Sequence, residues 1–142
     1  MSRLTVTKEV VWDCAHQLVH HSGLCKNVHG HTYKLQATFI GDIQEGTHSS
    51  EGMIEDFGVI KKVLNEKIVD RFDHAWVAKG DEPILPFLKE YNYKVLELGV
   101  RTTAEKMAEW IYYELKDTIP TAQIYKVRLY ETATSYAEYT EH

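Results

Sequence analysis

The amino-acid sequence predicts an α+β domain in which an antiparallel sheet is covered on one side by helices. Two patterns indicate this class: strands with a two-residue apolar period near both ends of the chain, and two amphipathic helical segments between them. The expected order is two strands, a helix, a short strand, a second helix and two strands. We expect a single domain over residues 1–142, because this length can bury a core without disulfide bonds.

The first two expected strands place three histidines in phase with apolar side chains. The apolar face of the first strand consists of Leu4, Val6, Val10, Trp12, Cys14 and His16. The second strand, over about residues 29–40, has a face made of Tyr33, Leu35, Ala37 and Phe39. Alternate residues of a strand share a face, so tracing this pattern backwards puts His29 and His31 on the Tyr33 face.

The first helix is expected to begin at Asp56, which is a suitable N-cap residue. Its apolar stripe, at intervals of three and four, consists of Phe57, Ile60, Leu64 and Ile68. Residues 70–90 contain Pro83 and Pro86 and are expected to form a long loop. A short strand is expected over residues 95–100.

The second helix follows Thr102-Thr103-Ala104-Glu105, a pattern typical of a capping box with Thr102 as the N-cap and Glu105 reaching back. Its apolar face consists of Ala104, Met107, Ala108, Ile111 and Leu115. The last strands are expected over residues 124–131 and about 135–139. In the first of these, Glu131 falls in phase with Tyr125, Val127 and Leu129.

Composition excludes several classes of function. The net charge of −5 argues against general nucleic-acid binding, which depends on clustered lysine and arginine. No stretch has the roughly 20 consecutive apolar residues of a membrane span, and the N-terminal residues do not resemble a secretory signal. We therefore expect a cytoplasmic protein. In that reducing compartment Cys14 and Cys25 should be free thiols, although a disulfide between them is the alternative.

His16, His29 and His31 predict a metal site. Two histidines separated by one residue on a strand point the same way, about 7 Å apart at Cα, and can bracket one ion. A third imidazole from His16 would leave one coordination position open, which is typical of catalytic zinc. The alternative is that these are ordinary surface or core histidines without a metal.

Four further residues are candidates for a catalytic or ligand-binding role. Cys25 could be a metal ligand, because thiolate binds zinc well. It could instead be a base, because a nearby cation favours the thiolate form. The third possibility is an inert buried thiol. The adjacent Asp73 and His74 could form an oriented acid or base. Glu131, in phase with apolar residues, would need hydrogen-bond donors such as the N–H edge of a ligand; the alternative is an exposed strand end. Cys14 is expected to be structural.

Taken together, six ordered segments resemble the 6-pyruvoyl-tetrahydropterin synthase and 6-carboxytetrahydropterin synthase family. The segments are DCAHQL, CKNVHGHTY, MIEDFGVIKK, FDH, RTTAEKMAEWI and KVRLYET. The resemblance implies a tunnelling fold: an antiparallel four-stranded sheet with two helices on one face, closed with other subunits into a barrel. It also implies a homohexamer built as a dimer of trimers.

The resemblance also implies roles for individual residues. The three histidines would bind one Zn²⁺ per subunit. Cys25 would accept a proton, Asp73 and His74 would assist proton transfer, and Glu131 would anchor the pterin ring. Thr103 and Glu105 would line the pterin pocket, and Lys26 and Arg101 are candidates for contacts with the triphosphate.

The position of Cys25, separated from the HGH sequence by three residues, resembles the carboxy branch of the family. That branch is a lyase of queuosine and deazapurine biosynthesis that converts 7,8-dihydroneopterin triphosphate to 6-carboxy-5,6,7,8-tetrahydropterin, acetaldehyde and triphosphate. Two alternatives remain: the pyruvoyl-forming enzyme, which retains the side chain, and a non-catalytic binding module stabilised by zinc.

Overall fold

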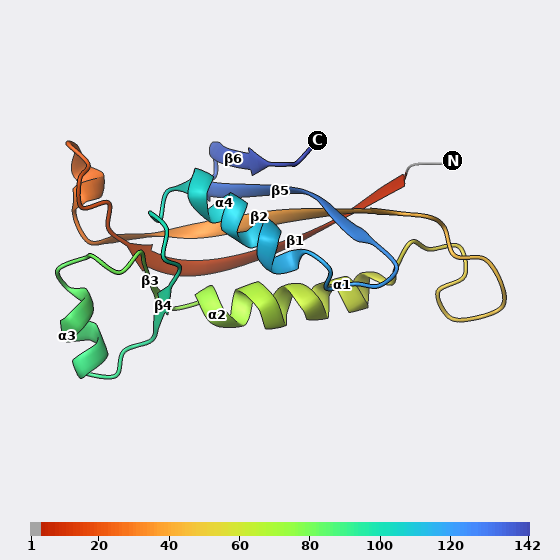
Figure 1. Cartoon of the computed structure of the whole chain (residues 1–142), viewed down its shortest axis with the longest axis horizontal. Coiled ribbons are helices and arrows are strands. Elements are labelled where there is room, and N and C mark those ends of the chain that lie inside the picture. Colours follow the sequence, from red (N-terminus) through yellow and green to blue (C-terminus); the bar gives the residue numbers. More distant parts are fainter. Residues whose placement is uncertain (1–3) are drawn as a thin grey trace.

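The computed structural model describes residues 4–142 and has the expected α+β architecture, with a sheet of six strands in the order β4-β3-β1-β2-β5-β6 (Figure 1). The strands are β1 (Leu4–His16), β2 (His29–Gly41), β3 (Trp76–Ala78), β4 (Val95–Glu97), β5 (Gln123–Thr132) and β6 (Ser135–Tyr139). The helices are η1 (Leu24–Lys26), α1 (Phe57–Leu64), η2 (Asn65–Val69), α2 (Asp70–Phe72), α3 (Leu85–Glu90) and α4 (Ala104–Leu115). The expectation of four strands, all antiparallel, is therefore wrong.

The long strands β1 and β2 form an antiparallel pair along their whole length. Trp12 lies opposite Tyr33, Cys14 opposite His31, and His16 opposite His29. Because alternate residues share a face, the predicted apolar stripes of both strands meet on one face of the sheet. The histidines therefore lie at the end of the hydrophobic core, as the sequence pattern predicted.

The two additional strands, β3 and β4, are short and parallel to their neighbours. Strand β4 lies where a short strand was expected, over residues 95–100, whereas β3 lies in the segment 70–90 that was expected to be a long loop and instead carries α2, β3 and α3. Three residues are too few to show a period, which is why the sequence pattern did not predict β3. Pro86 lies in the first turn of α3, a position where a fixed φ and a missing N–H favour a helix.

Strand β5 pairs with β2 and carries a bulge that changes its phase. The register shifts between Thr38 and Phe39, so that Ile124 pairs with Phe39 and is buried while Tyr125 is not. The sequence assignment of Tyr125 to the core face is therefore wrong. A bulge inserts one residue and reverses the alternation beyond it.

The segment α1, η2 and α2 is one nearly continuous helix that lies with α4 on the same side of the sheet (Figure 1). Asp56 caps it as predicted, with Oδ1 accepting from the backbone N–H of Gly58 at 2.6 Å. The predicted stripe residues Ile60, Leu64 and Ile68 are fully buried, but Phe57 is 52% exposed. Phe57 sits in the first turn, before the helix passes over the sheet core.

Helix α4 completes this layer through buried Met107, Ala108, Ile111, Tyr112 and Leu115. Its N-cap is Thr103, whose side chain accepts from the backbone N–H of Lys106 at 3.2 Å. The prediction of Thr102 as the N-cap is therefore wrong by one residue. Within residues 4–142, no helix combines the length and apolar character needed to cross a membrane.

Candidate metal centre and active site

The side chains of His16, His29 and His31 converge at one end of the β1–β2 pair. Their ring centroids are 4.5 to 5.2 Å apart. One nitrogen from each ring lies within 4.8 Å of the other two, which makes this the group among residues 4–142 that is arranged to hold a metal ion. The predicted cluster of three histidines is thus present, and it is consistent with metal binding.

Backbone carbonyls orient two of the three rings. The Nδ1 atom of His16 donates to the backbone oxygen of Thr102 at 2.9 Å, and Nδ1 of His29 donates to the backbone oxygen of Asn27 at 2.7 Å. Because a carbonyl oxygen can only accept, the proton of each ring is on Nδ1 and the lone pair is on Nε2. This is the tautomer that a metal ligand requires.

The Nε2 atoms of all three histidines are buried and have no hydrogen-bond partner in the described part of the chain. Buried polar atoms without partners are uncommon, and three in one cluster need a common explanation. A single cation among them would satisfy all three. The residues present therefore fit a metal ion.

Burial favours the neutral, cation-binding form of two rings of this cluster, His16 and His31. Burial is the main cause that lowers the pKa of His16 to about 4, and repulsion from His29 and His31 acts in the same direction. Burial also lowers the pKa of His31, and the carboxylate of Glu131 offsets part of that effect. Neutral imidazoles at physiological pH do not have to lose a proton before they coordinate a metal.

Cys25 lies in the single turn η1, next to the cluster along the chain. Its backbone oxygen accepts from the N–H of Leu18 at 2.9 Å, and two residues later the backbone oxygen of Asn27 orients His29. The Cys25 sulfur does not belong to the group of mutually close ligand atoms. Both Cys25 and Cys14 are free thiols, so the alternative of a disulfide between them is excluded.

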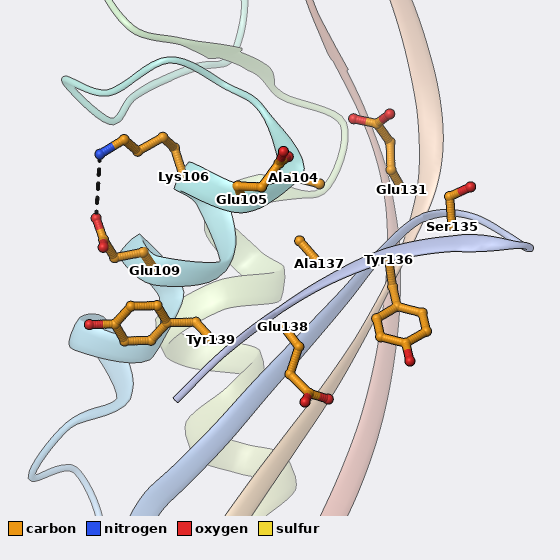
Figure 2. Close-up of a pocket in the computed structure, with 10 residues that line it drawn as sticks. All are labelled: Ala104, Glu105, Lys106, Glu109, Glu131, Ser135, Tyr136, Ala137, Glu138 and Tyr139. Atoms are coloured by element: carbon orange, nitrogen blue, oxygen red, sulfur yellow. Dashed lines mark ion pairs between the residues drawn. The ribbon is translucent and has the colours of Figure 1, made fainter. Parts of the chain in front are cut away.

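Glu131 is placed beside the cluster by the end of β5. Its Oε1 atom lies 3.9 Å from Nε2 of His31, and its side chain is 26% exposed. It also lines a cavity of about 570 Å³ between α4 and β6. Figure 2 shows Glu131 on one side of this cavity and Glu105, in the first turn of α4, on the other.

The remaining predicted pocket residues are divided between two places. Glu105 lines the cavity with Glu131, but Thr103 caps α4 and lines a separate hollow with Arg101. Arg101 forms a two-point ion pair with Asp81, with distances of 2.8 and 2.7 Å.

Asp73 and His74 form the predicted pair but do not belong to the group of close ligand atoms formed by the three histidines. Asp73 Oδ2 is 3.0 Å from Nδ1 of His74, and its other oxygen accepts from the backbone N–H of Asp13 at 3.1 Å. Donation from Asp13 is the main cause that lowers the pKa of Asp73. His74 is 79% exposed and lines a hollow that it shares with His31 of the cluster. Asp13 and Thr32 also line this hollow; they alternate with the buried residues of β1 and β2 and so belong to the opposite face of the sheet.

Two residues of the site were missed by sequence reasoning. Thr102 is fully buried against His16, and its pattern in the sequence indicated only a helix cap. Tyr33 was assigned to the core, yet its ring centroid lies 5.6 Å from that of His31 and 6.3 Å from that of His16. Burial is the main cause that raises the pKa of Tyr33, and the nearby Cys14, Glu131 and Cys25 contribute.

Comparison with known proteins identifies the family of the chain. The family model described as 6-pyruvoyl tetrahydropterin synthase matches residues 5–142. The chain belongs to this family. A 6-carboxy-5,6,7,8-tetrahydropterin synthase from Haemophilus influenzae is 37% identical to it over 140 residues, covering 96% of this chain and 98% of the relative.

Other members of the 6-pyruvoyl tetrahydropterin synthase family are also similar. The 6-pyruvoyl tetrahydrobiopterin synthase of Pongo abelii is 31% identical over 119 residues, covering 82% of this chain and 70% of the relative. The solved structure of the Caenorhabditis elegans 6-pyruvoyl tetrahydropterin synthase superposes with a TM-score of 0.71 at 22% identity, covering 100% of this chain and 98% of the other. This last likeness supports the fold.

Proposed function

We propose that the chain is a zinc-dependent 6-carboxy-5,6,7,8-tetrahydropterin synthase. It converts 7,8-dihydroneopterin triphosphate to 6-carboxy-5,6,7,8-tetrahydropterin and releases acetaldehyde and triphosphate. The observation that carries this proposal is the convergence of three unpaired histidine nitrogens beside Glu131. The name of the Haemophilus influenzae relative supports the carboxy product. A cytoplasmic location and a role in queuosine biosynthesis belong to the same proposal.

His16, His29 and His31 would hold the zinc ion. One nitrogen of each ring lies within 4.8 Å of the other two, so the three imidazoles could bind the same ion. Three protein ligands leave a fourth position for the substrate. When bound, zinc would supply Lewis-acid polarisation of the substrate side chain, which makes the adjacent C–H bonds more acidic.

Glu131 and Cys25 would position the substrate and move protons. The carboxylate of Glu131 offers two acceptor oxygens to the N–H edge of a pterin ring, and the cavity beside it gives the ring room, with Glu105 on the opposite side. Cys25 lies outside the ligand group, so its thiol remains available to accept a proton. Thr103 would contribute by fixing the start of α4 next to this cavity.

Asp73 and His74 would act on a site completed by a second subunit. Within one chain His74 lines a hollow beside β1 and β2 together with His31, but neither Asp73 nor His74 belongs to the group of mutually close ligand atoms formed by the three histidines. A homohexamer of two stacked trimers, with the sheets closed into barrels, would bring one subunit's pair to another subunit's cluster. Barrel closure would also remove the exposed edges of β4 and β6.

The pyruvoyl-forming reaction is the second candidate, because the matching family model and the Pongo abelii relative carry that description. The two reactions differ in the fate of the side chain. Purified zinc-loaded protein is incubated with 7,8-dihydroneopterin triphosphate, and acetaldehyde and pterin products are measured. We expect one acetaldehyde per pterin converted. A pyruvoyl product without acetaldehyde would reject the carboxy assignment.

A further inference from the structure

Tyr33 carries a hydroxyl group for which the described part of the chain supplies no partner. Its side chain is 0% exposed, and its hydroxyl oxygen makes no hydrogen bond to any residue of 4–142. A buried hydroxyl without a partner destabilises the folded state, because it loses its hydrogen bonds to water and gains none. Phenylalanine would fill the same space without that loss. Packing alone therefore does not explain a tyrosine here.

The position of Tyr33 in the sheet places this hydroxyl next to the candidate active site. Tyr33 lies between its cross-strand partner Trp12 on β1 and the end of β5. The β2–β5 pairing runs to Lys34 opposite Tyr130, and one further step in the same register brings Glu131 opposite Tyr33 on the same face. Directly opposed residues have Cβ atoms about 5 Å apart.

The Tyr33 hydroxyl is one of four unpaired polar atoms that belong to neighbouring rings. Seven buried side-chain atoms lack partners in residues 4–142, and four of them, from Tyr33 and the three histidines, come from rings packed against one another. A metal ion explains the three nitrogens, which offer lone pairs. It does not explain a phenol O–H, which is a hydrogen-bond donor at neutral pH. The hydroxyl therefore needs a hydrogen-bond acceptor.

We propose that the Tyr33 hydroxyl donates a hydrogen bond to an acceptor atom of the pterin substrate bound beside Glu131 and the histidine cluster. This inference rests on the proposed function. It makes Tyr33 a substrate-contacting residue in addition to Glu131. The substrate would replace the partner that the protein itself does not supply, so Tyr33 would be unsatisfied only while the site is free of substrate.

The test uses Tyr33→Phe, which removes only the oxygen, and Tyr112→Phe as its matched control. Tyr112 is also buried, at 3% exposure, but its hydroxyl lies on the α4 side of the core and donates to the backbone oxygen of Ile124 at 3.5 Å. Three quantities are measured on the zinc-loaded proteins: the Tm without substrate, the zinc content, and kcat/KM with 7,8-dihydroneopterin triphosphate.

For Tyr33→Phe we expect the Tm to rise by about 2–4 °C, because an unsatisfied buried group is removed. We expect zinc content to stay unchanged and kcat/KM to fall about tenfold or more, because the substrate loses a donor. For Tyr112→Phe we expect no rise in Tm and an unchanged kcat/KM. This combination of higher stability and lower activity is not produced by a purely structural role.

Other outcomes overturn the inference in distinguishable ways. A lower Tm for Tyr33→Phe would show that the hydroxyl has a partner within the protein. An unchanged kcat/KM, with an active parent enzyme, would reject the substrate contact and leave the proposed function standing. A parent protein that binds zinc but does not convert the pterin triphosphate would reject both together.

Discussion

The Nδ1 atom of His16 donates to the backbone oxygen of Thr102, which lies 86 positions further along the chain, at 2.9 Å. This hydrogen bond joins the end of β1 to the segment that precedes α4. The imidazole is buried at this position, and burial lowers the pKa of His16 from 6.5 to about 4, while the hydrogen bond to Thr102 opposes part of the shift. The metal-free protein should therefore lose stability on acidification.

The direction of this pH dependence follows from when His16 binds a proton in the folded and in the unfolded chain. Above pH 6.5 the ring is neutral in both the folded and the unfolded chain, while between pH 6.5 and about 4 only the unfolded chain binds the proton. The stability is thus fully present above pH 6.5 and declines by about 3 kcal/mol towards pH 4. Thermal unfolding of metal-free protein across this range measures it. In His16→Gln the stability should depend less on pH, whereas in His20→Gln, the control at an exposed histidine, it should decrease as in the parent protein. The same decrease in the parent and both variants would contradict the prediction.

Each histidine of the cluster should be necessary for metal binding. His29→Ala removes one of three nitrogens, so zinc affinity should fall by at least about 100-fold, whereas His48→Ala, an exposed histidine outside the cluster, should leave it unchanged. Competition with a chelator measures the affinity. Zinc should also dissociate below about pH 5 as the imidazoles are protonated. Zinc retained well below that pH would count against this ligand set.

Cys25→Ala should separate the roles of base and ligand. We expect a loss of turnover of about 100-fold or more with full zinc content, because the thiol lies outside the ligand group and would move protons. Cys14→Ala, at the other free thiol, is the control and should keep its turnover. Loss of zinc from Cys25→Ala would identify the sulfur as a ligand. Unchanged turnover would instead show that Cys25 is not the base.

Two inactive variants should complement each other if the site is shared between subunits. We expect Cys25→Ala and His74→Ala homo-oligomers each to have low activity, because each lacks one proton-transfer group. After dissociation and joint reassembly, some sites would combine an intact Cys25 with an intact His74, and activity should recover to about a quarter of the parent value if subunits mix randomly. The activity of the mixture before and after reassembly is compared. No recovery in verified mixed oligomers would place both residues in one chain's site.

Glu131→Gln should weaken substrate binding more than it affects zinc. The amide keeps the size of the side chain but offers one acceptor oxygen where the carboxylate offers two, so an N–H edge loses a charge-assisted bond. We expect kcat/KM to fall about 10- to 100-fold with zinc content retained. Glu138→Gln, at another carboxylate lining the same cavity, is the control and should have a smaller effect. Similar losses in both variants would deny Glu131 a specific role.

Local patterns in the sequence were sufficient to predict the long helices and strands and the histidine cluster. The two-residue period of β1 and β2 carries information at every position, so it correctly predicted that His16, His29 and His31 share one face of the sheet. The same reasoning identified Asp56 as a cap and the buried stripe of the first helix except for Phe57, which is exposed. It also predicted a short strand at the position of β4, but it failed for β3, which is too short to show a period, and for Tyr125, whose phase is changed by a bulge.

The sequence by itself determined which residues share a face and which residue types suit a metal and a pterin, because both follow from chain geometry and side-chain chemistry. Only the tertiary structure decided that Thr102 holds His16, that Tyr33 keeps an unpaired hydroxyl beside the cluster, and that His74 lies on the other face of the sheet. These relationships join segments that are distant along the chain or depend on what burial leaves unsatisfied. Contacts of that kind are set by packing, and they have no local signature.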